Sequence, residues 1–318
     1  MVNGFGYAVS ADSIARLSPD DAAASDAPFV WLHLEATDDA TRAWLGRALG
    51  FDAYLLDALT AVETRPRSDS VGAAALVNLR GSSAEAMRAS EPLASIRMVA
   101  SAGRVASVAR RPLDALPPVI AAVEAGDLRD PGDLIAAIAT AITEHLDPQV
   151  ADLGDRLDDC EEHLDEARVI EIRREVKRTR AQAIGYRRFL SPQRAALEKL
   201  AAMPFGWLND DDRLHLAAAA DRAARMAEEV ESIRERSALL HESLTDIRAE
   251  QIDQRALVIS IVAMVFLPLT FVTGLLGMNV QGIPFAERPW AFQGVVVVCA
   301  VMGALIAGYF GRRHWFRR

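Results

Sequence analysis

The sequence is poor in the residues that build disulfide frameworks and metal modules. Only two cysteines occur among 318 residues, Cys160 and Cys299, and they lie in very different surroundings. A disulfide scaffold and a four-cysteine zinc module are therefore excluded. Acidic residues outnumber basic ones by 44 to 35, which argues against nucleic-acid binding, because phosphate contacts need clustered Lys and Arg. The first ten residues have no basic start and no apolar core, so we expect no secretory signal.

Charge is missing altogether from one part of the chain. The 31 residues 256–286 carry no charged side chain, and neither do the 23 residues between Arg288 and Arg312. Because about 20 apolar residues in a helix span a bilayer, we predict transmembrane helices at 256–278 and 291–311, joined by an external loop at 279–290. Two buried core helices are the alternative interpretation. A basic tail at 312–318 predicts that both termini are cytoplasmic, since positive charge beside a span stays on that side.

The residues before the first span are predicted to form two domains. Domain 1–149 has an α/β pattern, and the apolar runs 29–34, 73–79, 95–100 and 104–109 are predicted strands. The segments 38–49, 53–62, 113–125 and 131–145 are predicted helices. Domain 150–255 is predicted to be a helical stalk, with one helix at 152–189, a new start at Ser191-Pro192 and a stop at 203–206. Trp31 and His33 are expected in the core or on the sheet.

The stalk is predicted to end in one very long helix, with Asn209 as its N-cap. Neither Pro nor Gly occurs from 210 to 267, so the helix should continue to residue 277, which is roughly 100 Å at about 1.5 Å per residue. A helix of this length needs partners, which predicts an oligomer. Its acidic residues near the membrane are either a solvated face or a vestibule that concentrates cations. They are Glu242, Asp246, Glu250 and Asp253.

The first span ends in Gly277-Met278-Asn279 and continues Val280-Gln281-Gly282-Ile283-Pro284. With two C-terminal spans and a basic tail, this motif resembles the CorA superfamily of divalent-cation transporters. Further matches resemble its ZntB-type zinc transporter branch: Trp31-Leu32-His33-Leu34, Glu63-Thr64-Arg65-Pro66-Arg67, Ser191-Pro192-Gln193-Arg194 and Trp207-Leu208-Asn209-Asp210-Asp211. The resemblance covers nearly the whole chain. Gln281 is a departure, because a small residue is expected there.

The resemblance implies a funnel-shaped homopentamer in the bacterial inner (plasma) membrane, built from an α/β cytoplasmic domain, a long stalk helix and two transmembrane helices. Gly277, Met278 and Asn279 would form the pore entrance, and Glu287 would lie in the external loop. The lumen would be lined by Ala256, Ile259, Leu267 and Thr270, with Glu242 and Asp253 below. The implied cargo is a divalent cation, with zinc favoured over other divalent cations, and the implied mode of transport is proton-coupled uptake. A CorA-type magnesium channel and a membrane-anchored sensor module are the rival hypotheses.

The residues of the first span restrict how a metal could pass. No Asp, Glu, His or Cys precedes the motif within it, so a dehydrated tetrahedral zinc site is not available there. We expect a hydrated cation, whose water Asn279 could contact through its side-chain oxygen. The hydroxyls of Thr270 and Thr273 could face the lumen or bond their own helix.

Two further pairs have spacings suited to a metal. Cys160 and His163 are three residues apart, and Asp211 and His215 are four apart. The alternatives are an incidental pair for the first and a helix-capping role for the second. No resident cofactor is expected. No nucleophile lies beside a base in the sequence, so we expect no enzyme.

Overall fold

The computed structural model describes residues 2–61, 65–84, 93–164, 168–278, 283, 285 and 287–315. They divide into two compact units, Met1–His241 and Glu242–Arg318. The first unit combines a sheet with helices, and the second is helical. An α/β amino-terminal part, a long helix and a C-terminal helix are therefore all present, as the sequence predicts.

A seven-stranded sheet forms the centre of the first unit, in the order β2-β1-β3-β7-β6-β5-β4. Neighbouring strands are antiparallel except β3 and β7, which are parallel. The strands predicted at 29–34 and 104–109 are confirmed as β3 and β7, and the other two are longer than predicted. Three strands were not predicted: β1, β2 and β4. The bounds are β1 Gly4–Val9, β2 Ile14–Leu17, β3 Phe29–Leu34, β4 Arg67–Val71, β5 Ala74–Ser82, β6 Leu93–Ser101 and β7 Arg104–Ala109.

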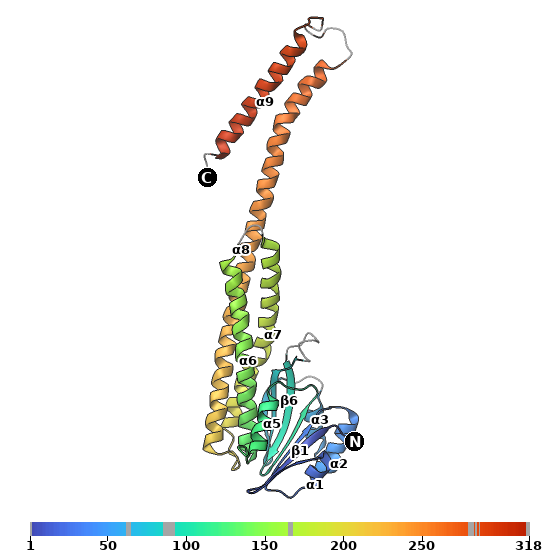
Figure 1. Cartoon of the computed structure of the whole chain (residues 1–318), viewed down its shortest axis with the longest axis vertical. Helices are drawn as coiled ribbons and strands as arrows, with labels where there is room; N and C mark the ends of the chain where they lie inside the picture. The colour runs from blue at the N-terminus through green and yellow to red at the C-terminus, as the bar shows by residue number, and fades with distance from the viewer. Residues whose placement is uncertain are drawn as a thin grey trace. The chain divides into compact units, whose positions relative to one another are not determined.

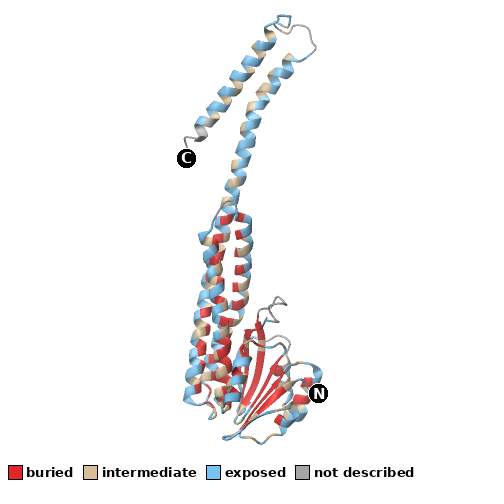
Figure 2. Ribbon diagram, viewed as in Figure 1, coloured by how far each residue is buried: buried red, intermediate tan, exposed pale blue. Residues whose placement is uncertain are grey.

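Helices cover both faces of this sheet (Figure 1). One face packs against α1 (Pro19–Ala24), α2 (Asp39–Leu49) and α3 (Ala53–Thr60), whose apolar side chains join those of β3, β6 and β7 in one core. The other face packs against α6 (Pro131–Glu162) and α7 (Val169–Ala201), with α5 (Leu116–Ala125) beside α6. Figure 2 shows the strands as largely buried. Aspartates Asp38 and Asp52 cap α2 and α3, which explains where these two helices begin.

The predicted core residues of β3 are confirmed. Trp31 and His33 are buried. Each ring has one nitrogen within hydrogen-bond distance of the same hydroxyl, because Ser107 Oγ lies 2.9 Å from Trp31 Nε1 and 2.8 Å from His33 Nδ1. Burial lowers the pKa of His33 to about 4, so this imidazole is neutral at physiological pH and serves packing.

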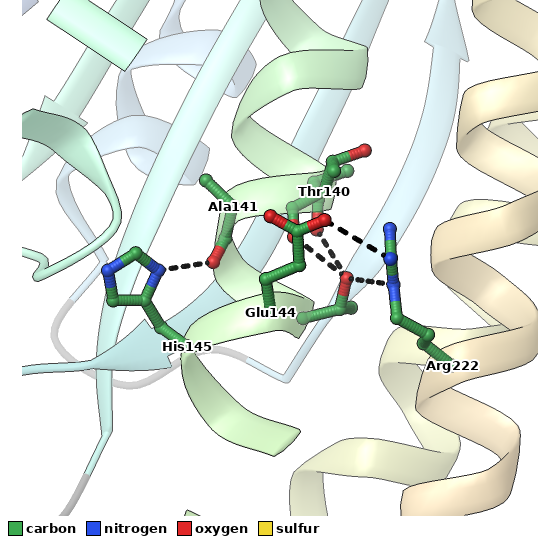
Figure 3. A network of polar contacts seen from close by, with 7 residues as sticks. Thr140, Ala141, Glu144, His145 and Arg222 are labelled. Atoms are coloured by element: carbon green, nitrogen blue, oxygen red, sulfur yellow. Dashed lines mark hydrogen bonds and ion pairs between the residues drawn. The ribbon is translucent and has the colours of Figure 1, made fainter. Parts of the chain in front are cut away.

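Helices α6, α7 and the first part of α8 (Asp210–Leu276) pack together through residues spaced three and four apart. The buried positions of α8 include Leu216, Ala223, Met226, Val230 and Ile233. Polar contacts tie α8 to its neighbours: Arg222 donates to Thr143 and Glu144 of α6, whereas His145 points away and bonds Ala141 of its own helix (Figure 3). Arg236 also pairs with Asp158 and Glu161 of α6.

Three helix boundaries were predicted wrongly. The helix expected at 131–145 continues to Glu162, and the single helix expected at 152–189 is in fact two, because α7 starts anew at Val169. Pro192 lies inside α7 and does not begin a helix. Its ring removes one backbone hydrogen bond, but buried Leu190 and Leu197 continue the apolar face on both sides. Packing of that face therefore outweighs the local signal.

The predicted stop and N-cap before α8 are confirmed. Helix α7 ends at Ala201, and Asn209 precedes α8. Asn209 Oδ1 accepts a hydrogen bond from the Asp212 backbone N–H at 2.9 Å, and Asp212 Oδ2 accepts one from the Asn209 backbone N–H at 2.9 Å. This reciprocal pair is a capping box.

Candidate transport site

The second unit consists of the end of α8 and of α9 (Ala291–Trp315). Helix α8 confirms the prediction of one uninterrupted helix to within a residue of its expected end. Both helices are long and apolar enough to cross a bilayer, and among the described residues none after Leu244 is buried (Figure 2). This exposure disfavours a pair of core helices. An apolar surface of this kind needs lipid or further chains to cover it.

One stripe of α8 is partly shielded and faces α9. Its members recur at helical spacing: Ile261, Val265, Pro268, Leu269, Val272 and Leu276. A Cβ atom placed on Gly303 of α9 would lie 3.7 Å from Leu269 Cδ1, so the two helices meet at this stripe.

The four predicted lumen residues lie on the opposite side of α8. At about 100° per residue, Ala256, Ile259, Leu267 and Thr270 fall within roughly 80° of arc. All four are exposed, Ile259 at 69% and Leu267 at 75%. The helix therefore brings them together on one uncharged face that α9 leaves open.

The hydroxyl groups near this face are turned toward their own helix. Thr270 Oγ1 donates to the Phe266 carbonyl at 2.8 Å, and Thr273 Oγ1 to that of Leu269 at 2.9 Å. Of the two alternatives for these threonines, the backbone bond is the one present. Each oxygen keeps acceptor capacity that hydration water could use.

Helix α8 ends where the motif begins. The Gly277 backbone N–H donates to the Thr273 carbonyl at 2.9 Å, and Gly277 and Met278 are both exposed. The C-terminal end of a helix carries a partial negative charge that favours cations. Asn279 and Gln281 lie outside the described residues. Glu287 lies just before α9 and is exposed.

All four acidic residues proposed for the vestibule are exposed, but they differ in direction. At about 100° per residue, Glu242 and Asp253 lie roughly 40° and 60° from Ala256, while Asp246 and Glu250 lie further round. Glu250 also accepts a hydrogen bond from Gln254 at 3.4 Å. Glu242 and Asp253 are thus the acids best aligned with the lumen face.

The two sequence-based zinc pairs are not joined by a third ligand among the described residues. Cys160 is buried, and burial raises the pKa of its thiol, while His163 is exposed and its Nδ1 lies 3.0 Å from the Asp159 carbonyl. His215 Nδ1 lies 3.5 Å from Asp211 Oδ2 and 2.9 Å from the Asp211 backbone carbonyl. Both histidines therefore hydrogen-bond within their own helix turns.

The structure gathers a different acidic group, which sequence spacing could not reveal. Asp130, Asp133 and Asp212 have carboxylate oxygens within 4.8 Å of one another. They come from the N-termini of α6 and α8, which are far apart in sequence. Asp130 and Asp212 both serve as caps there. Gly132 makes this approach feasible, since a Cβ at that position would lie 2.0 Å from Asp212 Oδ2.

We predict that Asp212→Asn stabilises the protein at neutral pH. Burial, with nearby Asp130 and Asp133, raises the pKa of Asp212 to about 6, so the folded chain binds a proton more readily than the unfolded one. The contribution of the Asp212 carboxyl to the free energy of unfolding is favourable at low pH and is lost as pH rises through about 6. Thermal unfolding in detergent should show the variant more stable by about 1–2 kcal/mol at pH 7.5, with the difference vanishing near pH 4. Exposed Asp211→Asn is the control, and equal melting of Asp212→Asn and wild type at pH 7.5 would contradict the prediction.

Comparison with known proteins adds family evidence to this geometry. The family model described as "CorA-like Mg2+ transporter protein" matches residues 26–313. The chain belongs to the CorA family. The sequence resemblance is thereby confirmed, as is the expectation that the chain is not an enzyme, because CorA members are transporters.

Individual CorA-family relatives match nearly the whole chain. The zinc transport protein ZntB of Pectobacterium atrosepticum is 30% identical over 303 residues, covering 95% of this chain and 92% of the relative. The divalent cation transporter CmaX of Pseudomonas aeruginosa is 32% identical over 292 residues, covering 90% and 87%. The solved structure of full-length CmaX protein superposes with a TM-score of 0.77 at 30% identity and covers 99% of both chains.

Proposed function

We propose that this chain transports divalent cations across a bilayer, with zinc as the main cargo. The observation that carries the proposal is the exposed, uncharged face of α8 that ends at the Gly277-Met278-Asn279 motif. An anchor helix would need neither this face nor the motif. The names of the relatives, a zinc transport protein and a divalent cation transporter, agree with this cargo.

Five copies of the chain are proposed to surround one pore, with the membrane part of α8 lining the lumen and α9 outside it. The face with Ile259 and Leu267 is left open by α9, and copies of the same face could cover each other around an axis. Rings of apolar side chains can gate a pore by dewetting. The cation would pass with much of its hydration shell, since the span offers no anionic or imidazole ligand.

The acidic residues are proposed to act at the cytoplasmic end of the pore. Five copies each of Glu242 and Asp253 would raise the local cation concentration through their summed field. At the other end, five helix C-termini at Gly277 would add partial negative charge, and five Asn279 side chains would contact the water around the ion.

The chain is proposed to lie in the bacterial inner membrane with both termini in the cytoplasm. Arginines follow the second span at 312, 313, 317 and 318, and such charges stay on the cytoplasmic side. Two spans return the chain to that side. Proton coupling is proposed to use groups outside the first span, because the span itself holds no titratable side chain. The candidates are Glu250, Asp253, Glu287 and the histidines of the cytoplasmic domain.

Zinc flux into liposomes containing the purified protein and a zinc-sensitive dye tests the proposal. We expect protein-dependent zinc entry that becomes faster with a pH gradient. Flux that ignores the gradient would refute coupling and leave transport intact. The family description favours magnesium as the second candidate cargo, so magnesium entry without zinc entry would replace zinc. Entry of neither ion would refute transport.

A further inference from the structure

Among the described residues of the first unit, one buried arginine has no acidic partner. Arg97, in the middle of β6, is only 3% exposed. Its Nε and Nη1 atoms are buried and have no hydrogen-bond partner. Buried charges in proteins are normally paired, so a buried guanidinium with unpartnered nitrogens lowers the stability of the folded state. An anion that binds there would remove this cost.

Further arginines converge on the same place from neighbouring strands. Arg80 lies on β5, and Arg110 and Arg111 directly follow β7. With Arg97 and Ser95 they line a cavity of about 50 Å³. None of the described residues that line it is acidic. The described part of the lining is therefore positively charged, and nothing in the transport site uses it.

The sheet holds the base of this cavity in place. Arg80 pairs in register with Ser95, and Arg97 with Val108. Arg80 Nε donates to Ser95 Oγ at 2.9 Å, its guanidinium carbon lies 4.0 Å from the centre of the Phe189 ring, and its backbone N–H donates to Gln193 Oε1 at 2.7 Å. The first two contacts hold the side chain of Arg80 and the third holds its backbone, and none of them neutralises Arg97.

The charge of Arg97 persists at neutral pH. Burial, followed by the like charges of Arg80 and Arg110, lowers its pKa to about 10, which still leaves the group protonated. Like charges close to a buried cation destabilise it, and an anion bound beside Arg97 would offset this effect. Arg110 is exposed, so an anion could reach the cavity from solvent.

We infer that this cavity, with Arg97 at its base and Arg80, Arg110 and Arg111 around it, is a binding site for a phosphoryl group. Guanidinium groups bind phosphate oxygens through paired, charge-assisted hydrogen bonds. The cavity has room for one tetrahedral anion, while any group esterified to it would remain outside. Free phosphate and a phosphate ester share this chemistry. The site is separate from the transport function proposed above.

Phosphate binding to the full-length chain in detergent micelles tests the inference. Calorimetry would give the affinity, and thermal unfolding would be compared in phosphate and in chloride at equal ionic strength. We expect phosphate to raise the melting temperature of the wild type. Arg97→Met should weaken phosphate binding about ten-fold or more, and should melt higher than the wild type in chloride, because it removes an unpaired buried charge.

A matched pair of exposed arginines keeps the test decisive if Arg97→Met does not fold. Arg110→Gln, at the cavity, should weaken phosphate binding several-fold, whereas Arg129→Gln, whose Nε bonds the Gly126 carbonyl elsewhere in the same unit, should not. Tighter binding of adenosine monophosphate than of phosphate would identify a phosphate ester as the ligand of the cavity. Equal or weaker binding of adenosine monophosphate would identify free phosphate as the ligand. No phosphate-dependent stabilisation, or equal affinity in Arg110→Gln and wild type, would overturn the inference.

Discussion

Replacing Asn279 with Ala should reduce zinc flux about ten-fold or more while the oligomer remains assembled. In the proposed pore, Asn279 is the polar side chain of the entrance motif, and its oxygen accepts hydrogen bonds from the water around the cation. Alanine offers no such acceptor. The entering ion would then lose contacts that offset the cost of leaving bulk water. Liposome flux measures the loss, and light scattering of the purified protein measures the mass of the assembly.

The matched control is Gln293→Ala, which removes an exposed amide from α9. In the proposed arrangement α9 lies outside the lumen, so this variant should transport zinc at the wild-type rate. Normal zinc flux in Asn279→Ala would contradict the proposal that five Asn279 side chains contact the hydrated ion at the pore entrance. A drop of equal size in both variants would show that amides on these helices matter for assembly or insertion, and not for ion entry.

The sequence predicted most successfully where one physical signal dominates a long stretch. From residue 210 onward no Pro or Gly interrupts the helical pattern before Pro268, and the helix runs to Leu276. The set Ala256, Ile259, Leu267 and Thr270 came from the family resemblance and not from periodicity, and the helix places these residues on one face. Strands β3 and β7 were also correct, because they are short apolar runs between clear turn residues.

Prediction failed where distant segments decide the outcome. Strands β2 and β4 are the two edges of the sheet, where partial exposure weakens the apolar alternation, and β1 lies beside β2. Pro192 lies within a helix because the buried face of α7 continues past it. The group formed by Asp130, Asp133 and Asp212 depends on two helix N-termini meeting, and the arginine cavity depends on the register of β5, β6 and β7. Neither arrangement leaves a local pattern in the sequence.

Replacing Leu267 with Ser should raise cation flux about ten-fold and weaken its gating. Leu267 is 75% exposed on the face opposite α9, and in the proposed pore five copies form an apolar constriction. Such a constriction excludes water, and therefore ions, unless it widens. A ring of serine hydroxyls would stay hydrated and let a hydrated cation through. Zinc entry into liposomes, measured without a pH gradient, should be faster in this variant than in the wild type.

A second leucine in the same unit provides the control for this result. Leu305 on α9 is exposed to a similar degree, 68%, but in the proposed arrangement it faces lipid or a neighbouring helix and not the ion path. Leu305→Ser should therefore leave flux unchanged, although both variants lose the same apolar side chain. Faster flux in Leu267→Ser alone would identify the open face of α8 as the wall of the ion path. If Leu305→Ser raised flux and Leu267→Ser did not, α9 would line the path instead.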